Sequence, residues 1–541
     1  MINPDLLAGA LGEQVRTWIA DDPNATDAAE LQALLDGRAT VELASRFAEP
    51  LTFGTAGLRG PLRAGPNGMN AAVVRRAAAG IAAYLSAQGL AGRIVVIGYD
   101  GRHRSQEFAR DSAAVLAAAG FDARLLPRLL PTPVLAFAVG RLQAAAGIMV
   151  TASHNPPQDN GYKVYAADGA QIVPPADTEI EAAIQASGPA RSIPLSPDYT
   201  TLDQSIVHDY VTAIAGLVNP DSARTISIVH TAMHGVGAEV VRAVLAAAGF
   251  AAPSEVAEQS EPDPDFSTVT FPNPEEPGAM DLALDLAERT GADLIIANDP
   301  DADRCAVGVP FDGSGWRMLR GDEVGVLLAD WLLRKGIRGT YATTIVSSTM
   351  LSALAARTGV PYAETLTGFK WISRAAPDLV FGYEEALGYA VAPSLVRDKD
   401  GISAGLLIAE LAATLAAEGS SIPRRLAELA AEYGLYSTRQ LSWRVPDLAL
   451  IAEAMSRLRT DPPARLLDRP VTITDLAPDN DVVTLRVEGG RVVVRPSGTE
   501  PKCKAYLEVI IAEAADLAAA EARAAAELDQ LAAEVTSALA F

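Results

Sequence analysis

Short apolar runs rich in Val and Ile recur along the chain, and each is followed by a polar or Gly-rich break and then by an Ala/Leu-rich helical stretch. They open the segments RIVVIGYDGRHRS (93–105), GIMVTASHNP (147–156), ISIVHTAMHGVG (226–237), DLIIANDPDADR (293–304) and TTIVSST (343–349). This α/β alternation predicts parallel sheets covered by helices on both faces. Since ligands of such sheets bind beyond the carboxyl ends of the strands, we expect the polar breaks to form the site.

The pattern changes around residues 433–442. Beyond them, DVVTLRVEGGRVVVRPSGTEPKCKAYLEVII has a Gly489-Gly490 hairpin signal between antiparallel strands, and a terminal helix follows. The polar, Pro-containing stretch 187–205 reads as a linker, and GWRMLRGDEVG (315–325) reopens a helix after a loop. We therefore predict an α/β chain of three related α/β domains with mixed, mostly parallel sheets plus a C-terminal α+β domain. The predicted boundaries are 1–205, 206–320, 321–438 and 439–541.

Length and composition are those of an ordinary globular chain. With 541 residues, 49% hydrophobic and 21% charged, it is too long for one core. No apolar run approaches the ~18 to 20 residues that span a bilayer, and MINPDLLAGALGEQ lacks the basic flank of a signal peptide. Two cysteines, Cys305 and Cys503, suit a reducing compartment and are too few for a thiolate metal site. We expect a cytoplasmic protein without a membrane partner.

The net charge of −23 argues against nucleic acid, because binding a phosphate backbone needs a field of Lys and Arg. An anionic ligand must then be held by a few positive groups that the fold brings together. These constraints favour a small-molecule partner.

The loop NDPDADR places Asp299, Asp301 and Asp303 at alternate positions after a predicted strand. Three close carboxylates repel one another, so a cation is the expected neutraliser, and oxygen-only ligands indicate Mg²⁺ or Mn²⁺ rather than Zn²⁺. An EF-hand is excluded, since its sixth and twelfth positions, Gly and Glu, are Arg304 and Pro310 here. The alternative is a solvated acidic turn.

The stretch TASHNPPQDNGYK (151–163) leaves another predicted strand and contains Ser153, His154 and Lys163. No GxSxG elbow lies nearby and no Walker motif occurs in the chain. His154 is a candidate base, although neighbouring side chains on an extended chain point in opposite directions. The alternatives are a capped polar turn and a serine that bonds to a divalent metal through a phosphate.

Together, TASHNPPQDNGYK, NDPDADR, GYEEALGY and RPSGTEPK resemble the motifs of the α-D-phosphohexomutase superfamily, in the same order. GTAGLRG, NPEEPGAMDLAL, TLTGFKWI and DKDGISA resemble its phosphoglucomutase-2/phosphopentomutase branch, which includes bacterial phosphomannomutases. The resemblance covers most of the chain. It implies four domains around a central cleft and a cytoplasmic isomerase, either a monomer or a homodimer.

The resemblance also implies roles for individual residues. Ser153 becomes the phosphoserine that donates its phosphoryl group, and Asp299, Asp301 and Asp303 hold one Mg²⁺ to which the serine phosphate is a further ligand. Lys163 corresponds to the general acid/base, with Arg59 beside it, and His154 remains a catalytic candidate. A lysine base near pH 7 needs its pKa lowered by about three units, or ~4 kcal/mol, whereas a protonated lysine serves as acid or electrostatically.

The substrate residues follow in the same way. Arg495, Ser497, Gly498 and Thr499 resemble the clamp for the phosphate that is not transferred, for which the alternative is an exposed Arg-Pro turn. Further implied contacts are Arg304, Thr367, Gly368, Lys370, Glu384 and Lys399. In better-known members a Ser follows two residues after the sugar-loop Glu, but here Ala386 follows Glu384, which removes one hydrogen bond to the sugar.

The implied reaction is the reversible conversion of a sugar 1-phosphate to a 6-phosphate, glucose first and mannose second, through a sugar 1,6-bisphosphate that is intermediate and activator. Phosphopentomutase and sugar-1,6-bisphosphate synthase are alternatives with the same site. A metal-dependent sugar phosphatase and a non-catalytic sensor are alternatives from other classes. The phosphatase is disfavoured because it needs no second phosphate clamp.

Overall fold

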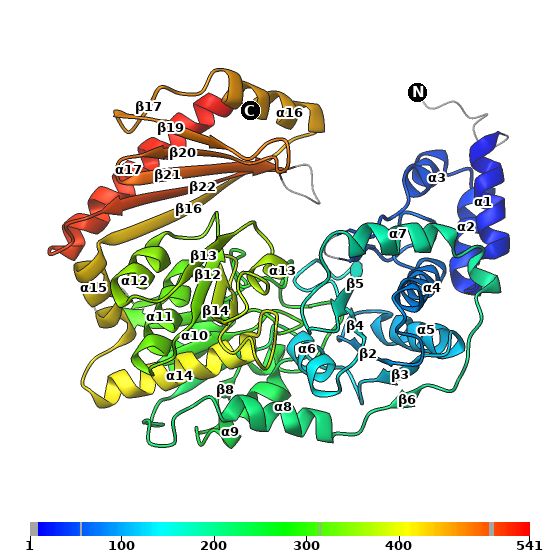
Figure 1. Cartoon of the computed structure of the whole chain (residues 1–541), viewed down its shortest axis with the longest axis horizontal. Coiled ribbons are helices and arrows are strands. Elements are labelled where there is room, and N and C mark those ends of the chain that lie inside the picture. The colour runs from blue at the N-terminus through cyan, green and yellow to red at the C-terminus, as the bar shows by residue number, and fades with distance from the viewer. Residues whose placement is uncertain (1–8, 55–56, 312, 314, 497–501, 541) are drawn as a thin grey trace. The chain divides into compact units, whose positions relative to one another are not determined.

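The computed structural model describes residues 9–54, 57–311, 313, 315–496 and 502–540 (Figure 1). The chain divides into two compact units, each described by itself. The first comprises the chain up to Leu319 together with Phe369–Arg374 and Gly388–Ala417. The second comprises Arg320–Gly368, Ala375–Leu387 and the chain from Glu418 onward.

The first unit begins with three helices, α1 (Ala10–Asp21), α2 (Ala25–Asp36) and α3 (Thr40–Phe47). Their apolar faces meet around Val15, Leu31 and Leu43, which are fully buried. Asn24 caps α2 by accepting hydrogen bonds from the backbone N–H groups of Thr26 and Asp27.

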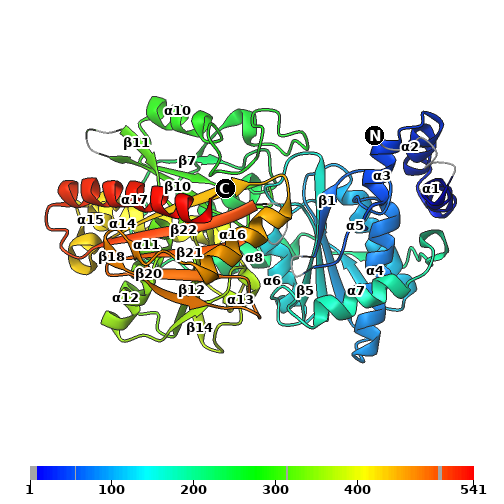
Figure 2. The same cartoon turned by 90° about the horizontal axis from the view of Figure 1, so that it is seen from above.

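A six-stranded sheet follows, in the order β1-β5-β4-β2-β3-β6. Its strands are β1 (Leu58–Pro61), β2 (Ile94–Tyr99), β3 (Asp122–Leu125), β4 (Ala146–Val150), β5 (Asp159–Ala166) and β6 (Thr200–Thr201). β1 and β5 join it antiparallel, and the other neighbours are parallel. The views in Figures 1 and 2 place α6 (Thr132–Arg141) on one face and α4 (Ala71–Ala87) and α5 (Ser105–Ala118) on the other. Helix α7 (Ala176–Ala186) packs on α4, and a short 3₁₀ helix, η2 (Ala190–Ser192), follows.

The second sheet of this unit has the order β11-β10-β9-β7-β8. It contains β7 (Ile228–Thr231), β8 (Ser254–Glu255), β9 (Leu294–Ala297), β10 (Ala306–Phe311) and β11 (Gly315–Met318). β8, β7 and β9 are parallel, whereas β10 and β11 are antiparallel additions. The helices are α8 (Ser205–Ala215), α9 (Ala238–Ala247) and α10 (Asp281–Thr290), with the 3₁₀ helix η3 (Ala257–Gln259).

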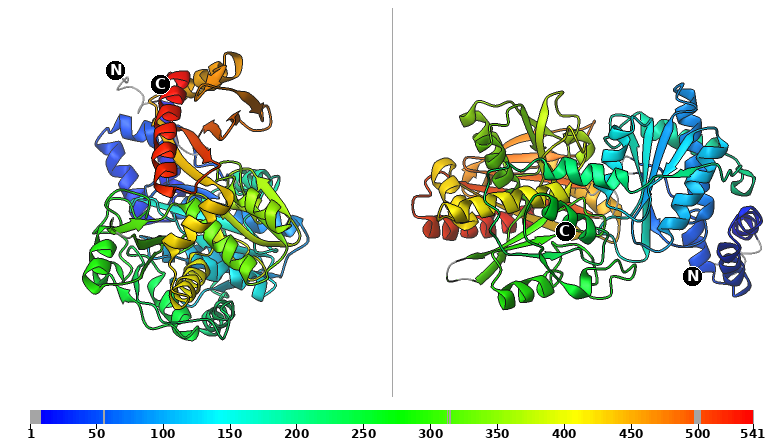
Figure 3. Two further views of the ribbon diagram at one scale, coloured as in Figure 1. Left: turned by 90° about the vertical axis from the view of Figure 1, so that its left-hand side faces the viewer. Right: turned by 90° about the horizontal axis from the view of Figure 1, so that it is seen from below.

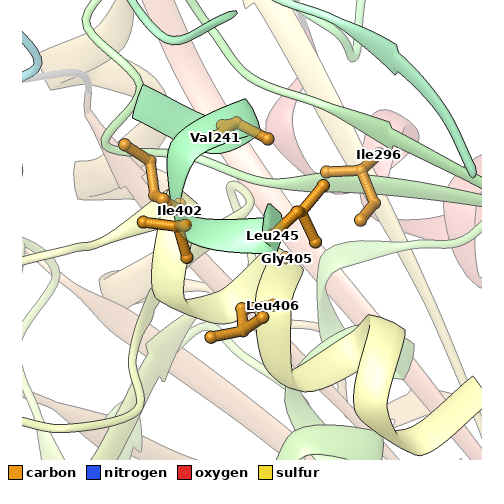
Figure 4. A pocket seen from close by; sticks show the side chains of 8 residues that line it. Val241, Leu245, Ile296, Ile402, Gly405 and Leu406 are labelled. Carbon is orange, nitrogen blue, oxygen red and sulfur yellow. The ribbon is translucent and has the colours of Figure 1, made fainter. Parts of the chain in front are cut away.

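Three later elements complete the first unit: α13 (Phe369–Ile372), β15 (Gly388–Ala390) and α14 (Gly401–Ala417). Helix α14 packs against α9 and β9. Figure 4 shows the apolar seam between them, where Val241, Leu245, Ile296 and Ile402 surround a cavity of about 10 Å³. A space this small and apolar is a packing gap rather than a ligand site.

The second unit contains three parallel strands in the order β13-β12-β14, namely β13 (Tyr362–Thr365), β12 (Thr340–Thr344) and β14 (Leu379–Glu384). Helices α11 (Gly321–Arg334), α12 (Met350–Thr358) and α15 (Ile422–Tyr433) accompany them. Tyr341, Phe381 and Tyr383 form a buried aromatic row across β12 and β14.

The C-terminal part of the second unit is an antiparallel sheet, β16-β22-β21-β20-β19. Its strands are β16 (Leu435–Arg444), β19 (Thr472–Asp475), β20 (Val483–Val487), β21 (Gly490–Pro496) and β22 (Lys502–Ile511), with the small ribbon β17 (Arg465–Leu466) and β18 (Arg469–Pro470). Helix α16 (Leu448–Thr460) precedes the ribbon. The red helix α17 (Leu517–Leu539) lies along β16 and β22 in Figure 3.

The predicted fold class is confirmed: mixed, mostly parallel sheets with helices precede an antiparallel α+β part. One local prediction was wrong. The β-branched run that opens 343–349 was expected to be a strand, but β12 ends at Thr344 and Ile345 and Val346 already belong to a turn, because the Thr344 hydroxyl accepts from the N–H groups of Val346 and Ser347. The hairpin predicted at the Gly pair is confirmed: β20 and β21 are antiparallel and turn at Glu488 and Gly489, with Gly489 at φ 67° and Gly490 already in β21.

Within the part of the chain that the structure describes, no single helix has the length and hydropathy to cross a membrane. One bent pair, Gly401–Ala417 and Ile422–Tyr433, meets the criterion by length and composition. Nearly every residue of the first of these helices is buried within the fold.

Candidate active site

The serine loop leaves β4 with a sharp backbone turn. Ser153 has φ 52°, in the left-handed region, and its N–H donates to Thr151 Oγ1 at 2.9 Å. The residue is 3% exposed, and its Oγ donates to Asp299 Oδ2 at 2.8 Å. A non-glycine residue in this conformation stores strain, which commonly marks functional sites. The loop is not extended, so the expectation that His154 points away from Ser153 was wrong: His154 Nδ1 lies 3.4 Å from Ser153 Oγ.

Arg102 holds this loop by its backbone carbonyl groups. Its guanidinium donates to the carbonyl oxygens of Ser153 (2.5 Å), Asn155 (2.6 Å), Pro156 (2.8 Å) and Asp159 (3.1 Å). It also lies 3.4 Å from the Asp100 carboxylate and stacks on the ring of Phe266. The five-donor fork of arginine suits a set of carbonyls that converge in this way. We did not predict this residue, although YDGRHRS directly follows a buried strand.

Asp299, Asp301 and Asp303 follow β9 and are completely buried, with one oxygen of each within 4.8 Å of the others. The Oδ1 atoms of Asp301 and Asp303 have no hydrogen-bond partner among the described residues. Buried carboxylate oxygens without partners are costly unless a cation binds them. This donor set fits a hard divalent cation such as Mg²⁺.

The backbone of this acidic loop is fixed by close contacts. Asn298 Nδ2 donates to Arg304 O at 2.7 Å, and His230 Nε2 lies 3.0 Å from Asn298 Oδ1. A Cβ atom on Gly401 would lie 2.1 Å from Arg304 O, and one on Gly235 would lie 2.3 Å from the Cα of Pro300. Glycine is therefore required at both positions, and the Gly of DKDG supports the acidic loop by its lack of a side chain.

Lys163 projects from β5 toward the acidic loop. Its Nζ donates to Asp301 Oδ2 at 2.7 Å and to Asp303 Oδ2 at 2.8 Å. Burial lowers the pKa of Lys163, but the attraction of the two carboxylates outweighs burial, so its pKa is raised. The lowered pKa that a lysine base requires is therefore absent in this arrangement, and Lys163 carries a proton.

Two further groups reach the same carboxylates. Thr132 Oγ1, at the start of α6, donates to Asp301 Oδ2 at 2.6 Å, a contact that we did not predict. Lys399 Nζ lies 3.2 Å from Asp303 Oδ2 and 3.8 Å from Asp398 Oδ1. Burial raises the pKa of Asp303, yet Lys163, Lys399 and Arg304 together lower it well below its ordinary value. The pKa of Asp299 is raised well above the ordinary value, first by burial and then by repulsion from Asp301 and Asp303.

Arg59, His154 and Arg304 surround these groups. Arg59 pairs with Gly161 across β1 and β5, two residues from Lys163 and therefore on the same face, and it donates to Asn155 Oδ1 at 3.1 Å. Arg304 Nε lies 3.8 Å from both Asp299 and Asp303. Burial, followed by the charges of Arg304 and Arg59, lowers the pKa of His154 well below its ordinary value. His154 is therefore neutral beside Ser153 Oγ.

Lys370, in α13, belongs to the first unit, and its ammonium makes no hydrogen bond to the acidic loop among the described residues. Its side chain is buried, and the ammonium lies over the ring of Trp371 at 5.0 Å without a hydrogen bond to another described residue. Burial lowers the pKa of Lys370 to about 8; the charge of Asp177 opposes this shift, and repulsion from Arg374 adds to it. A buried ammonium without an acceptor suits an anionic ligand.

The remaining predicted residues lie in the second unit. Thr367 and Gly368 form the bend after β13, with Gly368 at φ 111°, and Glu384 is the last residue of β14. Arg495 lies on β21, on the same face of the sheet as Tyr506 of β22. Ser497, Gly498 and Thr499 lie outside the described residues. Ser153, His154, Lys163, Arg59, Arg304, Lys399 and the three aspartates thus share one site in the first unit.

The chain matches four domain families in order. These are the phosphoglucomutase/phosphomannomutase alpha/beta/alpha domains I (residues 50–191), II (208–310) and III (320–433) and the C-terminal domain (443–530). The helices α1 to α3 precede the first match.

Proteins and structures with these domains are similar over nearly the whole chain. A probable phosphomannomutase of Haemophilus influenzae is 48% identical over 454 residues, which cover 82% of this chain and 93% of that protein. A phosphopentomutase of Mus musculus is 35% identical over 561 residues, covering 92% and 90%. The crystal structure of a putative phosphomannomutase from Thermus thermophilus superposes with a TM-score of 0.70 at 28% identity, covering 89% and 99%. The chain belongs to the phosphoglucomutase/phosphomannomutase family of the α-D-phosphohexomutase superfamily, whose enzymes are mutases of the isomerase class.

Proposed function

We propose that this chain reversibly converts a sugar 1-phosphate to a sugar 6-phosphate, with glucose as the first substrate and mannose as the second. The transfer passes through a phosphoserine at Ser153 and a sugar 1,6-bisphosphate. The observation that carries the proposal is the 2.8 Å contact of Ser153 Oγ with a cluster of three buried carboxylates. A cation bound by those carboxylates would adjoin a phosphate on this serine.

Asp299, Asp301 and Asp303 would hold one Mg²⁺, to which a phosphate on Ser153 would add an oxygen ligand. The ion, when bound, neutralises charge on the phosphoryl oxygens. The unpartnered Oδ1 atoms of Asp301 and Asp303 support this assignment, because Lys163 already uses the Oδ2 atoms.

Proton transfer falls to Lys163, with Arg59 and His154 beside it. In the first half-reaction the P–O bond to Ser153 Oγ breaks and a P–O bond to a sugar hydroxyl forms. That hydroxyl loses a proton, and Ser153 Oγ gains one. Lys163, which is protonated and projects from β5 to the acidic loop, is the proposed carrier: it gives its proton to Ser153 Oγ and takes up the proton of the sugar hydroxyl. Arg304 and Lys399 add positive charge around the phosphoryl group.

The rest of the substrate is assigned to other residues. Arg495, with Ser497, Gly498 and Thr499, would bind the phosphate that is not transferred, and Lys370 offers a second buried cation. Glu384, Thr367 and Gly368 would face the sugar. After the first transfer the bisphosphate reorients, so that its other phosphate meets Ser153 and the second transfer regenerates the phosphoserine. Exclusion of water during this step protects the phosphoserine from hydrolysis.

The identity of the sugar is the finer question. Ala386 offers no hydroxyl to a hexose, and a lost neutral hydrogen bond costs ~0.5 to 1.5 kcal/mol. Phosphopentomutase and bisphosphate synthase activity therefore remain the alternatives. Comparing kcat/KM for the 1-phosphates of glucose, mannose, glucosamine, ribose and deoxyribose ranks them. A rate for ribose 1-phosphate tenfold above that for glucose would assign the chain to pentoses.

The proposed mechanism is tested by intact-mass analysis after incubation with glucose 1,6-bisphosphate and Mg²⁺. We expect one added phosphate on the wild type and on a Ser192→Ala control, which changes an exposed serine of η2, and none on Ser153→Ala. Ser153→Ala should also lose mutase turnover. Near-normal turnover of this variant would exclude the mechanism, and phosphate release without isomerisation would indicate a phosphatase. Light scattering would distinguish a monomer from a homodimer, the two states that we predict as alternatives.

A further inference from the structure

The five residues Ile345–Thr349, here called the IVSST turn, connect β12 to α12 in the second unit. Val346, Ser347 and Ser348 are buried. The turn is held by Thr344, whose Oγ1 accepts from the backbone N–H of Ser347 at 3.2 Å and lies 2.8 Å from Ser347 Oγ. Buried polar turns need many partners. Those of the IVSST turn come from three parts of the second unit: the loop after β14, the C-terminal sheet and the start of α11.

The first partner is Glu385, in the loop after β14. Its Oε2 accepts from Ser347 Oγ at 3.0 Å and from Thr344 Oγ1 at 3.3 Å, and its backbone N–H donates to Ser347 Oγ at 3.2 Å. A Cβ atom on Gly321 would lie 1.9 Å from the Glu385 carbonyl oxygen, so the loop rests directly on the start of α11. Both the side chain and the backbone of Glu385 are thereby fixed, one residue after Glu384 and one before Ala386.

The second set of partners comes from the C-terminal sheet. Arg491 Nη1 donates to Ile345 O at 3.1 Å, and its Nη2 donates to Ser347 O. Glu508 of β22 accepts from the N–H of Thr349 at 2.8 Å and from its Oγ1 at 2.7 Å, and lies 3.4 Å from Arg491 Nε. Arg491 lies on β21 four residues before Arg495, and residues four apart on a strand share a face.

The third partner is Asp322, at the start of α11. Its Oδ1 accepts from the N–H of Ser348 at 2.7 Å and from the Tyr383 hydroxyl at 3.1 Å, and its Oδ2 accepts from Thr438 Oγ1 at 2.9 Å. Tyr506, which shares a face of the sheet with Arg495, belongs to one buried cluster with Val346. A displacement of the IVSST turn would therefore change contacts both at the end of β14 and at β21.

We propose that the IVSST turn couples the loop at Glu384–Leu387 to the strand that carries Arg495, and that Glu385 is a positioning residue for sugar recognition. This inference rests on the proposed function, which assigns sugar hydroxyls to Glu384 and the distal phosphate to Arg495. Ser347 contacts both sides: its hydroxyl hydrogen-bonds to Glu385, and its carbonyl oxygen accepts from Arg491. The residues assigned to the two ends of the substrate therefore lie on elements that both contact the buried Ser347.

The proposal predicts a KM effect rather than a kcat effect, because neither Glu385 nor Ser347 touches the reacting atoms. We expect Glu385→Ala and Ser347→Ala each to raise KM for glucose 1-phosphate about tenfold with kcat within about threefold. Glu385→Gln keeps an oxygen that accepts from Ser347 and should restore KM to within about threefold of the wild type. Both serine and glutamate variants are made so that one folding failure does not end the test.

Coupling is measured with Arg491→Met, alone and combined with Glu385→Ala, and with inorganic phosphate as a competitive inhibitor. We expect Glu385→Ala to raise the inhibition constant of phosphate about threefold or more, and the double variant to fall short of the product of the single effects. The matched control is Glu364→Gln, which removes another carboxylate near Arg491, at 3.5 Å, without touching the turn. It should change KM by less than about twofold.

The proposed function is tested separately, with the variants Glu384→Ala and Arg495→Ala. If these raise KM while Glu385→Ala and Ser347→Ala leave it within twofold, or if the single effects multiply in the double variant, the coupling is wrong and the substrate assignment stands. If Glu384→Ala and Arg495→Ala leave KM unchanged, the substrate assignment fails, and the coupling fails with it.

Discussion

Ser153 Oγ lies 2.8 Å from Asp299 Oδ2, and this hydrogen bond joins the loop after β4 to the loop after β9. The two strands belong to different sheets of the first unit. The serine is fixed from both sides, since Arg102 holds its carbonyl oxygen and Asp299 its hydroxyl. The proposed phosphoryl carrier is therefore positioned before any ligand arrives, which lowers the entropic cost of the transfer.

The strained backbone of Ser153 leads to a prediction about two inactive variants. Ser153→Ala and Ser153→Gly both lose the hydroxyl, but only glycine adopts φ 52° without strain. We expect the Gly variant to be more stable than the Ala variant by about 1 kcal/mol in urea unfolding, after allowing for the greater entropy of unfolded glycine.

The control for this comparison is Ser192 in η2, whose backbone is not left-handed. There the order should reverse, because glycine is the poorer residue in a helical turn. If Ala were the more stable residue at Ser153 as well, the left-handed conformation of the loop would be wrong.

Metal binding should stabilise the first unit. Mg²⁺ at about 100 times its dissociation constant adds ~2.7 kcal/mol to the free energy of unfolding of the wild type, because it binds only the folded acidic loop. Asp301→Asn removes one charge from the three carboxylates and should abolish most of the Mg²⁺-dependent rise in Tm. Asp285→Asn, on the exposed face of α10, should retain it. An equal rise in all three proteins would place the ion elsewhere.

The sequence predicted those features that depend on the spacing of residues within a short segment. The alternate positions of Asp299, Asp301 and Asp303 after a β-branched run already imply one loop at a strand end, and the structure brings them together. Short apolar runs likewise located β2, β4, β7 and β9. In these cases the chemistry and the fold both reside in short stretches of consecutive residues.

Interactions between distant segments could not be predicted in this way. In the sequence, Arg102 is an ordinary polar residue. Its role depends on the fold, in which the carbonyl oxygen of Ser153, 51 residues later, accepts a hydrogen bond from its guanidinium. The protonated state of Lys163 depends on carboxylates 138 and 140 residues away, against the effect of burial. Ile345 and Val346 read as part of a strand because β-branched residues favour strands, and only the hydrogen bonds of the folded chain show that they lie in a turn.

Arg102 gives a further prediction. Arg102→Lys keeps the charge but has three donors on a tetrahedral nitrogen, so it cannot serve four convergent carbonyls and Asp100 at once. We expect a loss of about 2 to 4 kcal/mol in stability, faster amide exchange over residues 153–159, and kcat at least about tenfold lower. Arg93→Lys is the control, because Arg93 makes one exposed contact with Gln143 O, and it should cost under about 0.5 kcal/mol. Unchanged exchange in Arg102→Lys would contradict the role.

Glu385 should make stability depend on pH. Burial, followed by repulsion from Glu384 and Asp322, raises the pKa of Glu385 from its ordinary value of 4.5 to about 7. Below pH 4.5 both the folded and the unfolded states hold the proton. Between pH 4.5 and 7 only the folded state retains it, so the free energy of unfolding falls as pH rises. Above pH 7 both states are ionised, and the loss is complete.

The loss amounts to about 3 kcal/mol, from roughly 2.5 pKa units at 1.36 kcal/mol each. Glu385→Gln has no proton to release and keeps an acceptor for Ser347. We therefore expect it to match the wild type near pH 4.5 and to exceed it by up to about 3 kcal/mol at pH 8, measured by urea unfolding of each protein across this pH range. Glu513→Gln, an exposed change in the same unit, should follow the wild type at every pH. If the difference in the free energy of unfolding between Glu385→Gln and the wild type were the same at every pH, Glu385 would be ionised throughout. Its buried carboxylate would then accept from Ser347 in the charged form.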